Sequence, residues 1–449
     1  MEANIAVLGA SFNPVHWGHL HLLKEMDQRF HFEKIFLIPR GISKFKGGFP
    51  LLWPYRILLL REAIRTGLPK ALAEKTHILS TELDQVGLVS YSSATMAFLE
   101  ELCAARDRVY GLQVDHSDRI APAPATRHKI AFLAGDDLLF EFQQWHDFSR
   151  LATLVTFKVG MREETGQRAI ADQRREALRA LKEAYPEIDL ELVDHAPLPL
   201  SSTEIRQDPS QNHIEATMPA GAAATWKRLH LGQALALPED FGPEKLAGIE
   251  HDISLLASFL GEKRLIHLCT CMIFAIDLAK HYGIDYRRVY RPALFHDLAK
   301  ELPLDLQTWM AQQYDPELTA TFDENIMHGL ASAFYLREYL GWEDEVALKA
   351  VAFHSTLRPD PTDVEKIVFL ADKLEWGRTY RHLSRLRRAA QVSLDLGVYE
   401  TLRELDSSKI PLHPLSQELL EELKGTLADK TPGLPETGEE ERKEKRKKE

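Results

Sequence analysis

Cysteine is scarce in this chain, and acidic residues outnumber basic ones. Three cysteines in 449 residues cannot build the disulfide framework of a small secreted domain. Cys269 and Cys271 form a Cys-x-Cys pair that could suggest a metal site. Because residues two apart on a helix do not face each other, we instead expect buried thiols on an apolar helix. The 67 acidic and 55 basic residues give a net charge of −12, which argues against broad nucleic-acid binding and leaves room for a local basic pocket that binds phosphate.

Long apolar runs are absent as well. No run approaches the ~20 residues that a membrane-spanning helix needs, and no signal peptide is expected. We therefore predict a cytoplasmic protein without a membrane partner. The hydrophobic share of 45% is ordinary for a globular protein, and the chain length predicts two or three domains.

The first motif lies on a strand-to-helix turn. The apolar run 5–8 is typical of a buried parallel strand, and residues 20–29 predict a helix. Between them the sequence reads Gly9-Ala10-Ser11-Phe12-Asn13-Pro14-Val15-His16-Trp17-Gly18-His19. Such turns bind nucleotide phosphates in open α/β sheets, because a helix N-terminus favours an anion. His16 and His19 could stabilise the charge of a phosphoryl transfer, and the alternative is that they only cap the helix.

Predicted strands and helices go on alternating after this turn. Apolar runs predict further strands at residues 34–39, 77–83, 129–134, 151–159 and 188–193. This alternation predicts an α/β domain with a parallel sheet.

Polar residues stand at two loops of this domain. Lys46 follows the strand 34–39 and could fold over a polyphosphate, or it could be an ordinary solvated lysine. Ser90, Tyr91, Ser92 and Thr95 precede a predicted helix, which they could cap. A ligand site and a simple cap remain open for this cluster.

Two further turns carry groups that suit a nucleotide. Gly135-Asp136-Asp137 ends the strand 129–134, where an acid is well placed for a ribose hydroxyl, a metal ion or a helix cap. Ser201-Ser202-Thr203-Glu204-Ile205-Arg206 begins another helix, and its hydroxyls and arginine suit a phosphate. A capping box between Ser201 and Glu204 is the alternative. Because two phosphate-suited turns occur on one domain, we favour phosphate binding.

These pieces, in this order, resemble the signature of bacterial nicotinate mononucleotide adenylyltransferases, in the nucleotidyltransferase superfamily. The resemblance covers residues 1–232 and implies a Rossmann-like domain that adenylylates nicotinate mononucleotide with ATP and Mg²⁺, a step of NAD biosynthesis. It implies these binding residues: Gly9, Ser11, Phe12, Asn13, Lys46, Ser90, Tyr91, Ser92, Thr95, Gly135, Asp136, Asp137, Trp145, Ser201, Ser202 and Thr203.

Roles within that set also follow from the resemblance. His19 would make the strongest transition-state contact, with His16 and Arg206 in support. The matched acid is Asp136, with Asp137 second, and Trp145 would line the pyridine pocket. Two positions depart from the family pattern: Ser92 replaces a usual threonine, and Phe45 replaces a usual histidine.

The second half of the chain differs in character. The prolines and glycine of 235–243 indicate a domain boundary, and the spacing of apolar residues beyond it is helical. We predict a linker at 233–245 and an all-α domain at 246–425. The tail 426–449 is rich in charge and poor in apolar residues, so we expect it to be disordered.

Imidazole and carboxylate groups recur across the predicted helices of this domain. The candidates for metal ligands are His267, His296, Asp297, His328, His354 and Asp372. These groups suit divalent iron, manganese or zinc. A single buried histidine is more often structural, but so many candidates on several helices predict a metal site.

The order His, His-Asp, His, His, Asp resembles the HD phosphohydrolase superfamily. The words Arg264-x-x-His267, His354-Ser355 and Ala371-Asp372-Lys373-x-Glu375-x-x-Arg378 narrow the resemblance to the bacterial HD family that splits diadenosine tetraphosphate symmetrically into two ADP. The family pattern implies two metals, expected to be iron, with Asp297 as the bridge and the other candidates completing the shells. Arg264, Lys300 and Arg378 would neutralise the phosphate chain, and ordinary surface salt bridging is their alternative.

The sequence thus predicts a bifunctional enzyme whose partners are ATP, nicotinate mononucleotide and a diadenosine polyphosphate. One rival is that the first domain adenylylates another phosphate ester, such as phosphopantetheine. Another is that the HD domain is a nucleotide sensor without turnover. The sequence leaves open whether the acid or the amide mononucleotide is preferred. It also leaves open the oligomeric state, for which a homo-oligomer is one possibility.

Overall fold

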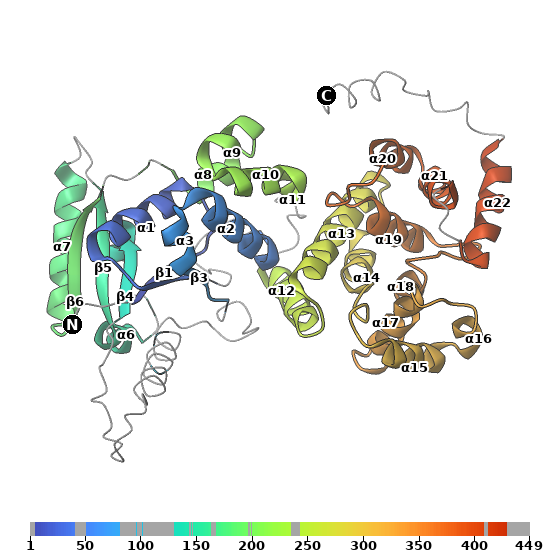
Figure 1. Ribbon diagram of the computed structural model, residues 1–449, viewed down its shortest axis with the longest axis horizontal. Coiled ribbons are helices and arrows are strands. Elements are labelled where there is room, and N and C mark those ends of the chain that lie inside the picture. Colours follow the sequence, from blue (N-terminus) through green and yellow to red (C-terminus); the bar gives the residue numbers. More distant parts are fainter. Residues whose placement is uncertain are drawn as a thin grey trace, which may run out of the picture. The chain divides into compact units, whose positions relative to one another are not determined.

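The computed structural model divides the chain into two compact units, Met1–Ser258 and Phe259–Glu449 (Figure 1). The residues that it describes are 5–40, 51–80, 96, 101, 130–142, 145, 147–162, 168–195, 198, 200–234, 243–407 and 412–428. Several predicted site residues lie outside this part of the chain: Lys46, Ser90, Tyr91, Ser92, Thr95 and the side chain of Asp137. The charged tail from residue 429 also lies outside it.

A six-stranded parallel sheet forms the centre of the first unit, which confirms the predicted α/β fold. The strand order is β3-β2-β1-β4-β5-β6, and every paired strand runs parallel to its neighbour. The strands are β1 (Ile5–Ala10), β2 (Lys34–Pro39), β3 (Thr76–Ile78), β4 (Ile130–Gly135), β5 (Val155–Arg162) and β6 (Asp189–His195). The central strands are apolar because the sheet is covered on both faces: Ile130 to Ala134 are at most 1% exposed.

Helices follow the strands in the usual α/β manner. They are α1 (Trp17–Phe30), α2 (Trp53–Gly67), α3 (Lys70–Lys75), the 3₁₀ helix η1 (Asp136–Phe140), α6 (Phe148–Leu154), α7 (Arg168–Ala184), α8 (Ser202–Gln207), α9 (Gln211–Thr217), α10 (Ala220–Arg228), α11 (Leu231–Ala234) and α12 (Pro243–Ala257). Figure 1 shows α7 beside β5 and β6, and α1 to α3 gathered near β1 to β3.

The strand order reverses between β1 and β4, and this reversal positions the first candidate site. From β1 the sheet continues through β2 and β3 on one side, and through β4, β5 and β6 on the other. Leu8 of β1 pairs with Leu133 of β4, so the turns that begin at Gly9 and Gly135 leave the sheet side by side. In open parallel sheets, ligands bind at such a switch point, outside the carboxyl ends of the strands.

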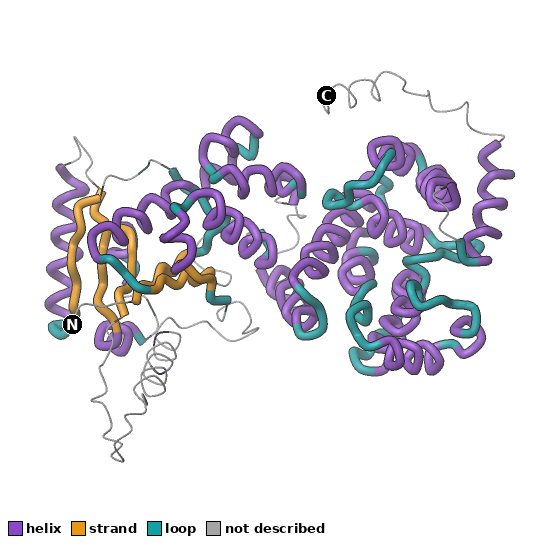
Figure 2. Tube along the Cα trace, in the orientation of Figure 1, coloured by secondary structure: helices purple, strands orange, loops and turns teal. Residues whose placement is uncertain are grey.

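Among the described residues of the second unit, every regular element is a helix (Figure 2), as predicted. Its elements are α13 (Glu262–His281), the 3₁₀ helix η3 (Tyr286–Arg288), α14 (Tyr290–Phe295), α15 (Leu304–Tyr314), α16 (Pro316–Thr319), α17 (Met327–Glu338), α18 (Glu345–Ala352), α19 (Asp363–Leu374), α20 (Leu383–Val392), α21 (Leu394–Ser407) and α22 (Pro414–Ala428). Helix α19 lies at the core, because Ile367 to Ala371 are fully buried. These five consecutive apolar residues cover all sides of the helix, so other helices must surround it there, and Asp372 follows them into the interior.

The division into units falls after Ser258, so α12 belongs with the first unit by its contacts. The linker predicted at 233–245 stays a prediction. Among the described residues, no helix is long and apolar enough to cross a membrane.

Candidate active sites

His16 and His19 cap the start of α1 reciprocally. Nδ1 of His16 accepts a hydrogen bond from the backbone N–H of Gly18 at 3.1 Å, and Nδ1 of His19 accepts one from the N–H of His16 at 3.2 Å. A neutral imidazole whose Nδ1 is an acceptor carries its proton on Nε2. Both rings, with centroids 3.8 Å apart, therefore keep an Nε2–H donor beside the helix N-terminus. Both histidines therefore cap the helix, and this capping is compatible with the predicted role toward phosphate, which stays a prediction.

The glycines of this turn serve different ends. A Cβ at Gly18 would lie 2.9 Å from Nδ1 of His16, so only glycine lets the imidazole cap the helix. A Cβ at Gly9 would lie 3.5 Å from the Phe132 ring, an ordinary contact. Packing against the described protein therefore does not require a glycine at position 9, which agrees with close approach of a ligand to the backbone there.

Helix α8 packs onto the same turn. Ser202 Oγ donates to the carbonyl of Pro14 at 2.9 Å, and Arg206 Nη1 donates to the carbonyl of Asn13 at 2.6 Å. Burial lowers the pKa of the Arg206 guanidinium. Ser201 forms the capping box that was the alternative reading, with Glu204 as its partner. The two turns predicted to suit phosphate are therefore neighbours in the fold.

The acidic pair and the tryptophan lie at the adjacent strand ends. Asp136, buried after β4, forms an ion pair with Arg174 of α7 at 2.9 Å. Its assignment as a ligand-binding acid stays a prediction, as does that of Asp137. Trp145 packs edge-on against Phe132 at a centroid distance of 5.7 Å, and the Arg40 guanidinium lies 4.3 Å from its ring centroid.

Arg56, near the start of α2, is a contributor that the sequence analysis missed. Its Nη1 donates to the carbonyl of Ser11 at 3.0 Å and to that of Arg40 at 2.6 Å, so it joins the turns after β1 and β2. The sequence signal that could have revealed Arg56 is a cationic residue among the apolar residues of a predicted helix.

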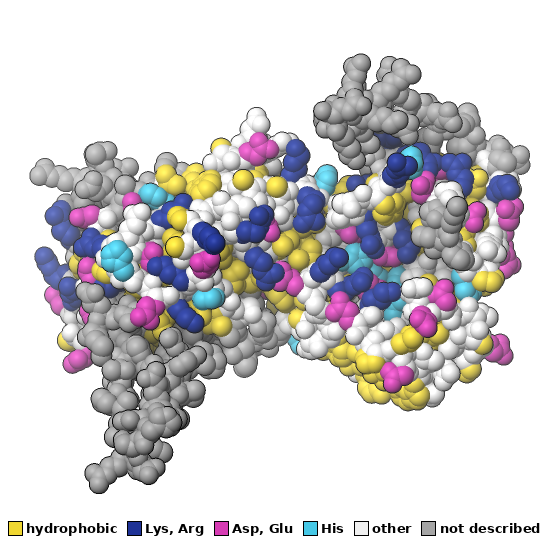
Figure 3. All heavy atoms as spheres, viewed as in Figure 1, with side chains coloured by type: hydrophobic (Ala, Val, Ile, Leu, Met, Phe, Trp, Pro, Cys, Tyr) yellow, Lys and Arg dark blue, Asp and Glu magenta, His cyan; other side chains and the backbone are white. Residues whose placement is uncertain are grey.

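In the second unit, the six predicted metal ligands come together from five helical regions. His267 lies on α13, His328 is the second residue of α17, and Asp372 lies on α19. His296 and Asp297 directly follow α14, and His354 follows α18. Figure 3 shows histidine side chains on this unit with lysine and arginine side chains beside them.

Asp297 lies between two pairs of imidazoles. Its Oδ1 is 2.9 Å from Nε2 of His328 and 3.4 Å from Nε2 of His354. Its Oδ2 is 3.8 Å from Nε2 of His296 and 4.0 Å from Nε2 of His267. Asp372 Oδ1 is 3.2 Å from the same nitrogen of His267. One carboxylate with a different histidine pair facing each oxygen is the arrangement that a bridging ligand needs.

Backbone carbonyls orient the rings for metal binding. Nδ1 of His296 donates to the carbonyl of Ala293 at 2.8 Å, and Nδ1 of His354 donates to that of Val351 at 2.7 Å. Each Nε2 then presents a lone pair to the cluster, because the proton is held on Nδ1. Nε2 of His296 is buried and has no hydrogen-bond partner among the described residues. Such an unsatisfied nitrogen is costly, and a divalent transition-metal ion would satisfy it, so the donor set fits a metal.

The pKa directions of four of the six groups agree with a ligand set. That of His267 does not, because Cys271, Asp372 and Glu375 outweigh burial and raise its pKa well above the ordinary range. Burial lowers the pKa of His354 to about 3 and also lowers that of His328, so both imidazoles are neutral at neutral pH. Burial opposes ionisation of Asp297 and Asp372. The surrounding histidines outweigh it at Asp297, and Lys373 with the histidines outweighs it at Asp372, so both pKa values lie well below the ordinary range. Neutral imidazoles and ionised carboxylates are the forms that bind metal.

Cations surround the two carboxylates. Arg264 Nη1 lies 2.6 Å from Oδ2 of Asp297, and Arg378 Nη2 lies 2.6 Å from Oδ1 of Asp372. Lys300 Nζ donates to the carbonyl of Asn325 at 2.9 Å, and burial lowers its pKa. Lys300 Nζ also lies 3.1 Å from Nδ1 of His328, so all three predicted phosphate-binding cations lie at the cluster. Lys373, whose Nζ is 2.7 Å from Oδ2 of Asp372, is a fourth cation at the cluster, to which the sequence motif assigned no role.

Two neighbours of His267 have contacts with its ring that the sequence did not predict. Glu375 Oε1 lies 3.2 Å from Nδ1 of His267 and orients that ring. Cys271 Sγ lies 3.6 Å from both ring nitrogens, and burial raises the pKa of the thiol to about 11. The signal for Cys271 was its spacing of four residues from His267 on one helix. Cys269 and Cys271 are both buried, as predicted.

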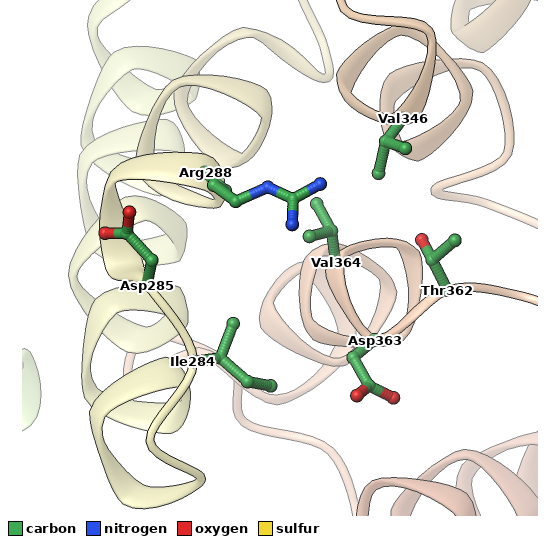
Figure 4. Close-up of a pocket in the computed structure, with 7 residues that line it drawn as sticks. All are labelled: Ile284, Asp285, Arg288, Val346, Thr362, Asp363 and Val364. Atoms are coloured by element: carbon green, nitrogen blue, oxygen red, sulfur yellow. The ribbon is translucent and has the colours of Figure 1, made fainter.

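A separate cavity of about 390 Å³ lies elsewhere in the second unit (Figure 4). Its lining residues are Ile284, Asp285, Arg288, Val346, Thr362, Asp363 and Val364. The Arg288 side chain extends into it, and none of the six candidate metal ligands lines it. The cavity is therefore distinct from the histidine cluster.

Family models match both units. Residues 7–208 match the cytidylyltransferase-like family, and residues 264–377 match the HD domain family. The symmetrical bis(5′-nucleosyl)-tetraphosphatase of Halalkalibacterium halodurans is 34% identical over 151 residues, which cover 33% of this chain and 81% of the relative.

Two further relatives extend the similarity to the first unit. A probable nicotinate-nucleotide adenylyltransferase of Treponema pallidum is 28% identical over 206 residues, which cover 45% of this chain and 85% of the relative. A probable nicotinate-nucleotide adenylyltransferase/Ap4A hydrolase of Mycoplasma genitalium is 22% identical over 378 residues, covering 84% of this chain and 89% of that protein. Through its HD unit the chain belongs to the family of symmetrical bis(5′-nucleosyl)-tetraphosphatases, joined here to a cytidylyltransferase-like unit.

Proposed function

We propose that this chain is a bifunctional enzyme of nucleotide metabolism. Its first unit transfers the adenylyl group of ATP to nicotinate mononucleotide, which gives the dinucleotide precursor of NAD. Its second unit hydrolyses diadenosine tetraphosphate, or a related dinucleoside polyphosphate, to two ADP. One observation carries this proposal: a Mycoplasma relative named for both activities aligns with 84% of the chain, across both units.

The first unit needs no covalent nucleophile for this reaction. The phosphate of the mononucleotide attacks the α-phosphate of ATP, and pyrophosphate leaves. The Nε2–H groups of His16 and His19 would donate to phosphate oxygens, where positive charge and the α1 N-terminus stabilise the transition state. Arg206 holds the turn through the Asn13 carbonyl and adds its charge. Mg²⁺, which we expect to arrive with ATP, would share the phosphates.

The second unit would hold two divalent metal ions, for which we expect iron. Asp297, between the two histidine pairs, would be the ligand common to both ions, and His267, His296, His328, His354 and Asp372 would complete the ligand set. When bound, the metals would polarise a phosphate and supply the hydrolytic nucleophile. Metal binding would neutralise the carboxylates, and Arg264, Lys300, Lys373 and Arg378 would then be available to the phosphate chain.

Product analysis of the purified chain tests both halves of this proposal. We expect ATP with nicotinate mononucleotide to give the acid dinucleotide and pyrophosphate, with lower kcat/KM for the amide mononucleotide. We expect diadenosine tetraphosphate to give two ADP and not ATP with AMP. Adenylylation of phosphopantetheine in place of the pyridine mononucleotide would refute the first assignment. Binding of the tetraphosphate without turnover by metal-loaded protein would refute the second and favour a sensor. A cytoplasmic location stays a proposal.

A further inference from the structure

Arg56 is a buried cation that joins two parts of the first candidate site. Its side chain is 1% exposed. One nitrogen, Nη1, donates to the carbonyl of Ser11 in the turn after β1 and to the carbonyl of Arg40 directly after β2. These carbonyls directly follow the neighbouring strands β1 and β2, so the guanidinium fixes the spacing of two adjacent turns at the carboxyl edge of the sheet. The first of these turns leads into His16 and His19.

A second contact links the same turn to the start of α2. Oδ1 of Asn13 accepts a hydrogen bond from the backbone N–H of Leu51 at 2.8 Å, and both atoms are buried. The start of α2 therefore supports the histidine turn from two sides, at Ser11 and at Asn13. A change in the position of this helix end would move the turn.

Glu250 of α12 neutralises this helix end. Its Oε1 lies 3.8 Å from Nη2 of Arg56, and its carboxylate accepts a hydrogen bond from the backbone N–H of Trp53. Helix α2 has Leu52 at its N-cap position and no side-chain cap from its own residues. A carboxylate beside an uncapped N-terminus is favourable, because it satisfies an orphan N–H and complements the helix dipole.

Helix α12 carries a buried apolar face. Leu246, Ile249, Ile253 and Leu256 are at most 2% exposed and recur at helical spacing, so they form one buried face. Burial lowers the pKa of Arg56, and Glu250 opposes that shift. Burial raises the pKa of Glu250, and Arg56 opposes that shift in turn. Each residue thus opposes the effect of burial on the pKa of the other.

We propose that Arg56 is a positioning residue for adenylyl transfer and that Glu250 completes this function from α12. Helix α12, which directly precedes the HD unit, then contributes a residue that supports the first active site. The inference rests on the adenylyl transfer proposed above. Displacement of a catalytic turn by about 1 Å can lower a rate about 100-fold, so the effect on kcat/KM should be large.

Replacement of the whole ion pair separates positioning from stability. Arg56→Met or Glu250→Leu alone leaves one buried charge without its partner, and we expect each to lower Tm in the full chain. The double variant replaces the pair with apolar groups, so Tm should recover toward wild type. Its kcat/KM for ATP should nevertheless stay about 100-fold low, because nothing then donates to the Ser11 and Arg40 carbonyls. Recovery of kcat/KM together with Tm would overturn the proposal.

Conservative variants carry the test if the larger changes prevent folding. Arg56→Lys retains a donor but loses the planar fork, and we expect kcat/KM between those of wild type and Arg56→Met. Glu250→Gln retains the acceptor for Trp53 and removes the charge, and we expect about a 10-fold loss in kcat/KM for ATP. Wild-type kcat/KM in both conservative variants would also overturn the proposal.

Lys75 supplies a matched control in the same unit. Its Nζ donates to Asp27 at 2.7 Å and to the carbonyl of Phe32 at 2.8 Å, so it too bridges a carboxylate and a backbone carbonyl. Lys75→Met should lower Tm and leave adenylyl transfer unchanged. Tetraphosphate hydrolysis by the HD unit should be unchanged in every variant. A wild-type chain that makes no dinucleotide would refute the proposed function itself, whereas an active wild type with an equally active Arg56→Met refutes only this inference.

Discussion

At the scale of single residues, both candidate sites depend on how each imidazole is oriented. His16 and His19 accept backbone N–H groups at Nδ1, so their protons lie on Nε2. His296 and His354 donate Nδ1–H to carbonyls, so their lone pairs lie on Nε2. The same side chain therefore presents an N–H donor in the first unit and a lone pair that suits a metal ion in the second, because the backbone holds opposite nitrogens.

The donor role of His19 gives the first prediction. His19→Ala should lower kcat for adenylyl transfer ~10²–10³-fold, because it removes a donor from the transition state. Steady-state pyrophosphate release measures this effect. His21→Ala is the control, since His21 lies on the same helix and faces Glu25. Equal loss in both variants would point to helix damage and contradict the catalytic role.

The position of Asp297 between two histidine pairs gives the second prediction. Asp297→Ala should lose bound metal and tetraphosphate hydrolysis together, while adenylyl transfer continues. Elemental analysis with both activity assays checks this. Asp363→Asn, which changes a carboxylate that is 60% exposed on α19, should retain metal and turnover. Abolished adenylyl transfer in folded Asp297→Ala protein would instead support a regulatory HD unit.

At the scale of elements, the beginnings of helices bring the first site together. Helix α1 starts at the histidine cap, α8 starts beside Pro14, and α2 starts beside Ser11 and Asn13. Helix N-termini favour anions, so the starts of α1 and α8 beside the strand-order reversal suit a polyphosphate, whereas Glu250 complements the start of α2. Gly18, the second residue of α1, cannot be replaced without moving the His16 ring, because a Cβ there would lie 2.9 Å from Nδ1 of His16.

Gly18→Ala should therefore disturb both the cap and the reaction. The new methyl group would meet the His16 ring and displace it from the Gly18 N–H. We expect a loss of about 1 kcal/mol in unfolding free energy, typical of a lost helix cap, together with slower adenylyl transfer. Denaturant unfolding and a rate assay measure the two effects. Gly248→Ala on α12 is the contrast: a Cβ there has nothing within 4 Å, so stability should rise slightly and the rate should not change. A Gly18→Ala protein with wild-type rate would show that the cap is dispensable.

At the scale of the whole chain, each chemistry uses groups from its own unit. The histidine turn, α8 and Arg56 lie in the first unit, and all six metal-ligand candidates lie in the second. Metal removal should therefore separate the activities. Chelator-treated chain supplied with Mg²⁺ should regain adenylyl transfer but not tetraphosphate hydrolysis, which should need added iron or manganese. Loss of both activities after Mg²⁺ is restored would mean that the HD metals also govern the first unit.

The sequence by itself determined the features that depend on neighbouring residues. An apolar run, a glycine-bearing turn and a helix predict a phosphate site because strand, turn and cap lie within about twenty residues of one another. The six metal-ligand candidates could be named because imidazole and carboxylate have a chemistry that does not depend on the fold. Ser201 and Glu204 could be predicted to form a capping box because they are only three residues apart, and they form it in the structure.

The tertiary structure alone decided which distant groups meet. Asp136 pairs with Arg174, Arg56 pairs with Glu250, and Asp297 faces a different histidine pair with each oxygen. The sequence places Glu250 in the helical half, yet its carboxylate lies at the start of α2 in the first unit. Such pairs form because packed helices and strands bring remote side chains within hydrogen-bond reach, and that packing depends on the whole buried core rather than on any local pattern.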